Sequence, residues 1–135
     1  AAFTITTDGT YFIRVENNNG LAGRSSTALL TVSDAPTWTT AAGTLGTFPQ
    51  GSAISVTVAA TGDSTIAYSK VSGSFPSGLT LNSSTGVISG TESGSDSSDT
   101  TYNFTLRATD DESQTADRAF SITISVGISE GMQFN

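Results

Sequence analysis

The 135-residue sequence contains neither cysteine nor histidine. Without cysteine there is no disulfide framework and no thiolate metal ligation, and without histidine the usual general base and the commonest transition-metal ligand are missing. Ser-His-Asp and Cys-His catalysis are therefore excluded, and we expect no bound transition metal. Apolar runs are only a few residues long, so the sequence predicts no transmembrane helix and no membrane insertion.

Basic residues are also scarce. Five Lys and Arg stand against twelve Asp and Glu, which gives a net charge of −7. Binding to nucleic acid needs a basic surface for the phosphates, so we expect no nucleic-acid partner. The first four residues lack the basic and apolar regions of a signal peptide, and we expect the chain to begin inside a longer polypeptide.

The apolar residues of the sequence mostly follow the pattern of short strands. No segment has the 3.6-residue apolar period of a helix. From residue 36 onward, alternating apolar residues occur in five sets separated by Gly, Ser, Asp and Pro: Ile54, Val56 and Val58; Ile66 and Tyr68; Leu79 and Leu81; Tyr102, Phe104, Leu106 and Ala108; Phe120, Ile122, Ile124 and Val126. This pattern predicts an all-β, antiparallel two-sheet sandwich without a helix longer than two turns. We expect its core to contain Tyr68, Leu79, Leu81, Ile88, Phe104, Leu106, Ile122 and Ile124.

The stretch 75–91 is typical of a strand, a tight turn and a second strand. Pro76 fixes its own φ, and Gly78 supplies the positive φ that a Pro-Ser-Gly turn needs. A run of Asn, Ser and Thr then leads to Gly86, as in side-chain-assisted turns. Gly90 follows two β-branched residues and indicates a bulge or a close backbone approach. Pro76, Gly78, Gly86 and Gly90 are therefore predicted to be structural turn residues.

Residues 36–126 resemble the immunoglobulin-like, cadherin-like repeat family of phage virion and bacterial surface proteins. The resemblance rests on Phe-Pro-Ser-Gly-Leu-Thr-Leu from Phe75, Ser-Thr-Gly-Val-Ile-Ser-Gly-Thr from Ser84, and Tyr-Asn-Phe-Thr-Leu-Arg-Ala-Thr-Asp from Tyr102. It implies an immunoglobulin-like β-sandwich. The family more often has proline where this chain has Glu92, and we expect this departure to affect a loop and leave the sheets unchanged.

The first 33 residues have a β-hairpin pattern of their own. Their alternating apolar residues flank a turn at 17–20: Tyr11, Ile13 and Val15, then Ala28, Leu30 and Val32. Residues 9–17 and 20–21 resemble the closing hairpin of an immunoglobulin-like domain of the IPT/TIG family, which implies a partial second β-domain at the N-terminus. Pro36 cannot donate to a ladder and Asp34 favours turns, so the sequence predicts a domain boundary at residues 33–36.

The predicted organisation is an incomplete IPT/TIG-like domain at 1–33, a sandwich at 34–127 and a tail at 128–135 that leads to a following domain or partner. Two strands alone are marginally stable in water. Either the chain is a fragment of a longer polypeptide, or the hairpin packs on a neighbouring molecule. The candidate interface residues are the apolar ones that such packing would cover: Tyr11, Ile13, Val15, Leu30, Val32, Met132 and Phe134.

Acidic residues supply the candidate metal ligands. Asp110, Asp111 and Glu112 are consecutive, and Asp34 and Asp63 lie in loops that a sandwich could bring to the same end. Calcium takes oxygen ligands of this kind, and cadherin-like modules, which this chain resembles, use inter-domain calcium sites, but the full cadherin ligand motifs are missing here. We therefore favour a solvated acidic turn that joins two strands. We expect no cofactor, and calcium only if the loop at 110–112 meets Asp34 or Asp63.

No residue is assigned a catalytic role. A glycosidase-like pair built from these carboxylates would need a substrate cleft and two environments that separate their pKa values. Trp38, the sole tryptophan, is either an aromatic platform for a sugar or a plug in the core or between domains. We favour the packing role because aromatic side chains are mostly buried.

The resemblance implies a non-enzymatic structural, decoration or adhesion module of a bacteriophage virion, located on a capsid, neck, tail or fibre. Its partners would be other virion or surface subunits, including copies of itself, or a host-surface glycan. The acidic charge and the lack of cysteine suit this role. The alternative is a spacer or weak carbohydrate-binding module of a bacterial surface adhesin or secreted enzyme, located at the cell surface or outside the cell.

Overall fold

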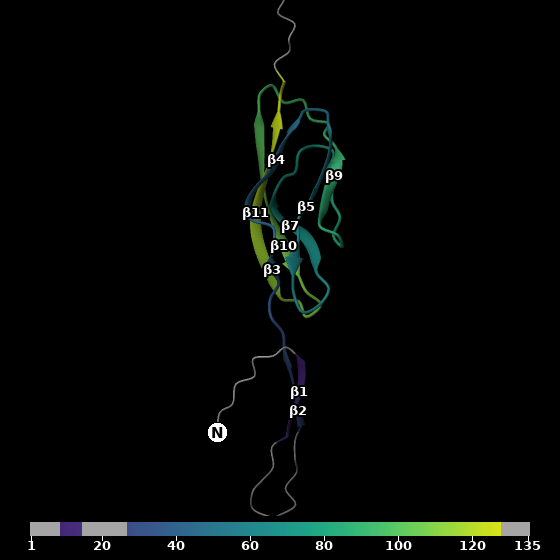
Figure 1. The fold of residues 1–135 in the computed structure, drawn as a ribbon, viewed down its shortest axis with the longest axis vertical. Helices are drawn as coiled ribbons and strands as arrows, with labels where there is room; N and C mark the ends of the chain where they lie inside the picture. The colour runs from purple at the N-terminus through teal and green to yellow at the C-terminus, as the bar shows by residue number, and fades with distance from the viewer. Residues whose placement is uncertain (1–8, 15–26, 128–135) are drawn as a thin grey trace, which may run out of the picture. The chain divides into compact units, whose positions relative to one another are not determined.

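A computed structural model describes residues 9–14 and 27–127 (Figure 1). These residues form strands, turns and loops, and no helix occurs among them, as the sequence predicts. No helix that could cross a membrane is therefore found in the described ranges. The chain divides into two compact units, Ala1–Asp34 and Ala35–Asn135.

The first unit contains one described ladder. Strands β1 (Gly9–Arg14) and β2 (Thr27–Val32) pair antiparallel, with Tyr11 opposite Leu30 and Ile13 opposite Ala28. The alternation in the sequence predicts this hairpin. Three candidate interface residues lie outside the described residues: Val15, Met132 and Phe134. Assignment of this unit to the IPT/TIG family stays a prediction.

The second unit is a β-sandwich (Figure 1). One sheet has four strands in the order β4 (Gly43–Pro49), β11 (Thr115–Ser125), β10 (Thr100–Thr109) and β7 (Ala67–Gly73). The other has three strands in the order β5 (Ala53–Thr57), β9 (Val87–Thr91) and β8 (Leu79–Leu81). A short ladder joins β3 (Thr37–Trp38) to β6 (Ala60–Thr61). The predicted all-β immunoglobulin-like fold is confirmed.

Apolar side chains of the two sheets form one core. Its buried members are Trp38, Ile54, Val58, Tyr68, Leu79, Ile88, Phe104, Leu106, Ala108, Phe120, Ile122 and Ile124. Every predicted core residue is buried except Leu81, which is half-buried and packs against the core. Leu81 ends the three-residue strand β8 beside the exposed residues 82–85, whereas Leu79 at the start of the same strand is buried.

Strand β4 makes the larger sheet mixed. It runs parallel to β11, with a register shift between Ser121 and Ile122. The other described ladders are antiparallel, as predicted. The sequence did not indicate β4, because two glycines and a proline occupy its seven residues and none of its residues is fully buried. It therefore lacks the alternation that identifies the other strands.

The position of Glu92 differs from the sequence-based expectation. We expected the presence of glutamate where the family more often has proline to affect only a loop. The Glu92 side chain is 2% exposed. The carboxylate accepts hydrogen bonds from the amides of Gly51 (2.8 Å) and Gly94 (2.5 Å), and the Glu92 amide donates to the Ser52 carbonyl (2.9 Å). Gly51 and Ser52 lie between β4 and β5, which belong to different sheets. Glu92 therefore anchors a connection between the sheets.

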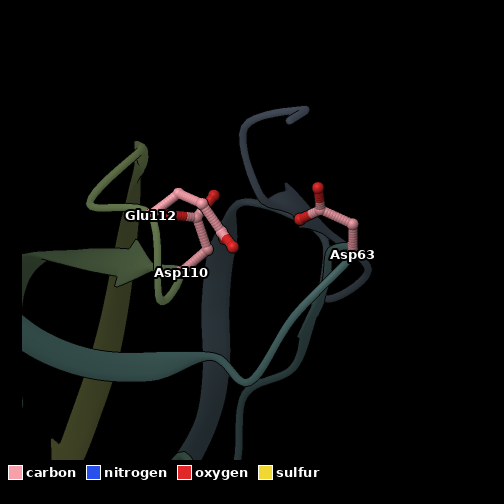
Figure 2. A group of neighbouring side chains, drawn as sticks. All are labelled: Asp63, Asp110 and Glu112. Carbon is pink, nitrogen blue, oxygen red and sulfur yellow. The ribbon is translucent and has the colours of Figure 1, made fainter. Parts of the chain in front are cut away.

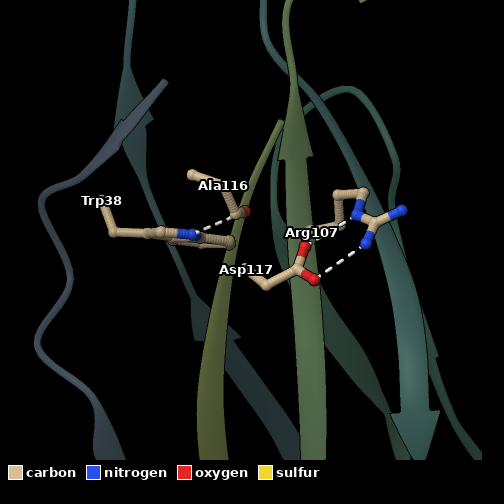
Figure 3. A network of polar contacts seen from close by, with 4 residues as sticks. All are labelled: Trp38, Arg107, Ala116 and Asp117. Carbon is tan, nitrogen blue, oxygen red and sulfur yellow. Dashed lines mark hydrogen bonds and ion pairs between the residues drawn. The ribbon is translucent and has the colours of Figure 1, made fainter. Parts of the chain in front are cut away.

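Trp38 has the packing role that we favoured. It is 6% exposed, and its ring centroid lies 5.7 Å from that of Tyr68 and 5.3 Å from that of Phe120. The indole Nε1 donates to the Ala116 carbonyl (3.0 Å; Figure 3). The ring is buried and its one donor, the Nε1 N–H group, already has an acceptor. No aromatic face is therefore open to a sugar.

Candidate cation site

The turn between β10 and β11 forms one side of the candidate site. Asp110 directly follows β10, and its side-chain Oδ1 accepts a hydrogen bond from the Gln114 amide (2.7 Å). The Asp110 amide donates to the Gln114 carbonyl (3.1 Å), and the Ser113 amide donates to the Asp110 carbonyl (3.1 Å). Ser113 has a φ of 70°, which is uncommon for a residue with a side chain. The backbone of the turn thus fixes the Asp110 carboxylate.

The loop between β6 and β7 forms the other side, and Ser64 joins it to the β10–β11 turn. The Ser64 hydroxyl donates to Oε2 of Glu112 (2.9 Å) and accepts a hydrogen bond from the Asp111 amide (3.0 Å). These bonds link positions 48 and 47 residues apart in the sequence. Asp63 precedes Ser64 and is therefore held close to the acidic turn.

Three carboxylates converge where the two loops meet. Asp63, Asp110 and Glu112 each offer one oxygen, and these oxygens lie within 4.8 Å of one another. Figure 2 shows Asp63 on one loop pointing toward Asp110 and Glu112 on the other. Asp63 and Glu112 are exposed, whereas Asp110 is only 5% exposed. Oδ2 of Asp110 is buried and has no hydrogen-bond partner.

The structure brings together three of the five acidic residues that the sequence singled out. Asp111 contributes its amide to Ser64 and is not part of the group. Asp34 falls in the first compact unit and is also outside the group. Ser64 was not predicted as part of this group, because nothing in the sequence distinguishes it from the many other serines.

In the second unit, the three basic side chains contact other groups. Arg107 pairs with Asp117 through Nε–Oδ1 (2.7 Å) and Nη2–Oδ2 (2.8 Å), as Figure 3 shows. The hydrogen bonds to Arg107 lower the pKa of the Asp117 carboxyl. The other two donate to main-chain carbonyls: Arg118 to Thr40 (2.7 Å) and Lys70 to Gly73 (2.6 Å).

A hollow of about 310 Å³ lies over the four-stranded sheet, away from these carboxylates. It is lined by Ala42, Gly43, Ser72, Asn103, Phe104, Thr105, Ala119, Phe120 and Ser121. None of these side chains is charged, so the lining offers no general acid or base of the kind that hydrolysis requires. The converging carboxylates thus form the described site whose chemistry points most clearly to a ligand.

Known families and structures match this architecture. The model of the family described as Putative Ig domain matches residues 35–125. No curated protein sequence is significantly similar to the chain. Among solved structures, Drosophila N-cadherin EC1-3 is 14% identical with a TM-score of 0.60, and the match covers 93% of this chain and 45% of the cadherin.

Two further structures have the same fold. Protocadherin gamma B2 extracellular domains 1–5 are 20% identical with a TM-score of 0.51, over 83% of this chain and 24% of that one. An endo-fucoidan hydrolase of glycoside hydrolase family 107 is 16% identical with a TM-score of 0.53, over 93% of this chain and 20% of the hydrolase. The chain spans less than half of each of these three structures. At these identities the likeness concerns the fold alone.

Proposed function

We infer that this chain, which belongs to the Putative Ig domain family, is a non-enzymatic structural or adhesion module that makes protein–protein contacts within a larger assembly. The match to the family supports the module type. The absence of histidine and cysteine from the sequence, and the uncharged lining of the hollow, support a role without catalysis.

The observation that carries this proposal is the two-stranded sheet of the first unit. The described residues of that unit form one ladder, β1–β2, and a two-stranded hairpin is marginally stable in water. Among the described residues no third strand pairs with β1 or β2, and a strand edge of this kind invites pairing with another chain. Covering the apolar residues of the hairpin would contribute roughly 25 cal/mol for each Å² removed from water. We therefore propose that partner contacts concentrate in residues 1–33 and 128–135.

We further propose that the assembly is a bacteriophage virion, with the module on the capsid, neck, tail or fibre. The resemblance to repeats of virion proteins supports this location. The lack of cysteine supports it as well, because the fold needs no oxidising compartment. The partners would be other virion subunits, including copies of this chain.

One observation favours a second candidate function. A fold of this kind occurs within an endo-fucoidan hydrolase, and the region that matches this chain is 20% of that hydrolase. The chain would then be a spacer or weak carbohydrate-binding module of a secreted enzyme or a bacterial surface adhesin. It would lie at the cell surface or outside the cell, and a glycan would be its ligand.

Immunoelectron microscopy distinguishes the two locations. An antibody raised against residues 35–127 is expected to label intact virions from an infected culture at regular positions. Prior incubation of the antibody with the purified chain should abolish the labelling. Labelling of the surface of uninfected bacterial cells, with none on the particles, would contradict the virion proposal. Binding of the chain to a glycan array would then support the second candidate.

A further inference from the structure

We propose that the outer edge of strand β5 in a second copy of this chain binds the β1–β2 hairpin, which adds one of its strands to the three-stranded sheet. This inference rests on the proposed function, since it names the partner surface that covers the hairpin. The main-chain geometry of β5, the path of residues 37–43 and the charges of the two units support it.

The main-chain groups of β5 point alternately toward β9 and away from it. On the β9 side, the Glu92 amide donates to the Ser52 carbonyl (2.9 Å), and the Val58 amide donates to the Gly86 carbonyl (3.0 Å). The two strands keep one register between these bonds. Successive residues of a strand direct their N–H and C=O groups to opposite sides. The β5 edge residues, whose groups therefore point away from β9, are Ala53, Ser55 and Thr57.

The position beside β5 is filled at one end only. Ala59, the next residue of the outward series, accepts from the amides of Thr39 (2.9 Å) and Thr40 (3.2 Å) and donates to Oγ1 of Thr40 (2.8 Å). The chain then leaves this edge and enters β4 of the other sheet at Gly43. The β5 edge residues are exposed, and no hydrogen bond to their outward groups occurs within the described ranges. This part of the edge can therefore accept another strand.

Strand β5 also lacks the features that keep sheet edges from pairing with other chains. Its five residues include no charged residue, proline or glycine. Each of the other sheet edges has such a feature: β7 contains Lys70 and a register shift, β4 ends in Pro49, and β8 has only three residues. Lysine, proline, bulges and short length all discourage strand addition. Of these four edges, β5 is the most open to an added strand.

An added strand would cover apolar side chains that the sandwich leaves half-buried. Val56 of β5 packs against the core without being fully buried, as do Leu45 and Phe48 of β4. Residues 50–52 join β4 to β5, so the two edges lie on the same side of the sandwich. A strand beside β5 directs every second side chain toward the core. The hairpin strands supply alternating apolar residues for this position: Tyr11, Ile13, Leu30 and Val32.

Charge and length favour the hairpin as the added segment. Residues 35–127 contain eight Asp and Glu and three Lys and Arg, a net charge of −5. Strands β1 and β2 contain one charged residue, Arg14. Two sandwiches therefore repel each other, whereas the hairpin strands are attracted to a sandwich. Each hairpin strand has six residues, enough to span the five residues of β5.

Hydrogen exchange of the full 135-residue chain at two concentrations tests the proposal. One added strand forms a small interface, for which we expect a Kd of about 10 µM. Samples are labelled at about 0.5 mM, where most edges would be filled, and at about 1 µM, where most would be free. Mass spectrometry with electron-transfer fragmentation then measures exchange at single amides.

Two sets of amides are expected to respond to concentration. The amides of the β5 edge residues and those of the hairpin at 9–14 and 27–32 should exchange about fivefold more slowly at the higher concentration. The amides of Ile54 and Val56 point toward β9 and serve as internal controls, so their exchange should not change.

Variants of Ser55 locate the edge. Ser55→Pro removes the central outward N–H group without removing a bond to β9, and it should weaken self-association in sedimentation equilibrium by about tenfold or more. Ser55→Lys adds the charge that natural edges use and should weaken it by about fivefold or more, which provides the test if the proline variant does not fold. Thr80→Lys is the matched control, because Thr80 is exposed on β8 and flanks the same residue of β9, Ser89, from the other side. It should leave self-association unchanged.

Four results would overturn the proposal. Concentration-dependent protection of the hairpin without the β5 edge residues would place the binding surface elsewhere on the second copy. Protection of the β5 edge residues alone would show that two sandwiches pair. A chain that stays monomeric at the higher concentration, with neither set of amides changed, would exclude a second copy as the partner. The fourth is an equal loss of self-association in Thr80→Lys. The proposed function fails on a different result, which is protection of the hairpin equal to that of the sandwich in a monomeric chain.

Discussion

Replacing Gly90 with alanine is expected to lower the free energy of unfolding of the sandwich by about 3 kcal/mol or more. Gly90 lies in β9 opposite Leu79 and has a φ of +152°. A Cβ atom there would lie 2.1 Å from the Gly78 carbonyl oxygen. Because the obstacle is the main chain of Gly78, just before β8, the clash can be relieved only by moving that backbone away from β9. Urea unfolding followed by circular dichroism measures the loss.

Gly127→Ala is the matched control. A Cβ atom at Gly127 meets nothing within 4 Å, so the same chemical change should alter stability by less than about 0.5 kcal/mol. If the Gly90 variant unfolds at the same urea concentration as this control, the result would contradict the close approach of the Gly78 main chain to Gly90.

Replacing Glu92 with alanine is expected to have the second large effect. It should lower the free energy of unfolding by about 2–4 kcal/mol. The carboxylate is buried and accepts hydrogen bonds from the amides of Gly51 and Gly94. Alanine would leave both donors without their charged acceptor, and it would open a cavity beside them. Hydrogen bonds to charged groups contribute more than neutral ones, so the cost exceeds that of a typical surface substitution.

Glu92→Gln separates charge from volume. Glutamine fills the same space but offers one acceptor oxygen, so it can satisfy only one of the two amides. We expect Glu92→Gln to lower the free energy of unfolding by about 1–2 kcal/mol, so its stability should lie between those of the wild type and the alanine variant. Thermal and urea unfolding of the three proteins should give this order. A wild-type stability for Glu92→Ala would show that the buried carboxylate holds nothing in place.

The strands that the sequence predicted best are those with the clearest two-residue period. In β10 and β11, Phe104, Leu106, Ile122 and Ile124 face the core because alternate side chains of a strand point to opposite faces. Leu81 follows the same pattern but is only half-buried, since it ends β8 beside the exposed residues 82–85. The two-residue period alone does not show where a strand ends, so it did not predict this difference from Leu79.

Features that depend on long-range placement were harder to predict. Strand β4 contains Gly43, Gly46 and Pro49 and is defined by its pairing with β11, more than 70 residues later. Glu92 was expected to affect a loop and leave the sheets unchanged, and only the approach of Gly51, 41 residues away in the sequence, makes it a buried acceptor.

The candidate site could be predicted only in part, for the same reason. The consecutive acids at 110–112 identified one loop of the group from the sequence. The second loop was left open between Asp34 and Asp63, since no local pattern states which loop meets the acidic turn. The contact of Ser64 with Glu112 makes that choice in the structure, and Asp63 follows from it.

The proposal that the β1–β2 hairpin needs a partner is tested most directly by hydrogen exchange on the isolated chain. A hairpin without a partner has a low free energy of opening, whereas the central strands of the sandwich open only with global unfolding. Amides of residues 9–14 and 27–32 are expected to exchange at least about a thousandfold faster than those of β10 and β11. Equal protection of the hairpin and the sandwich, in a chain that is monomeric in solution, would contradict the proposal.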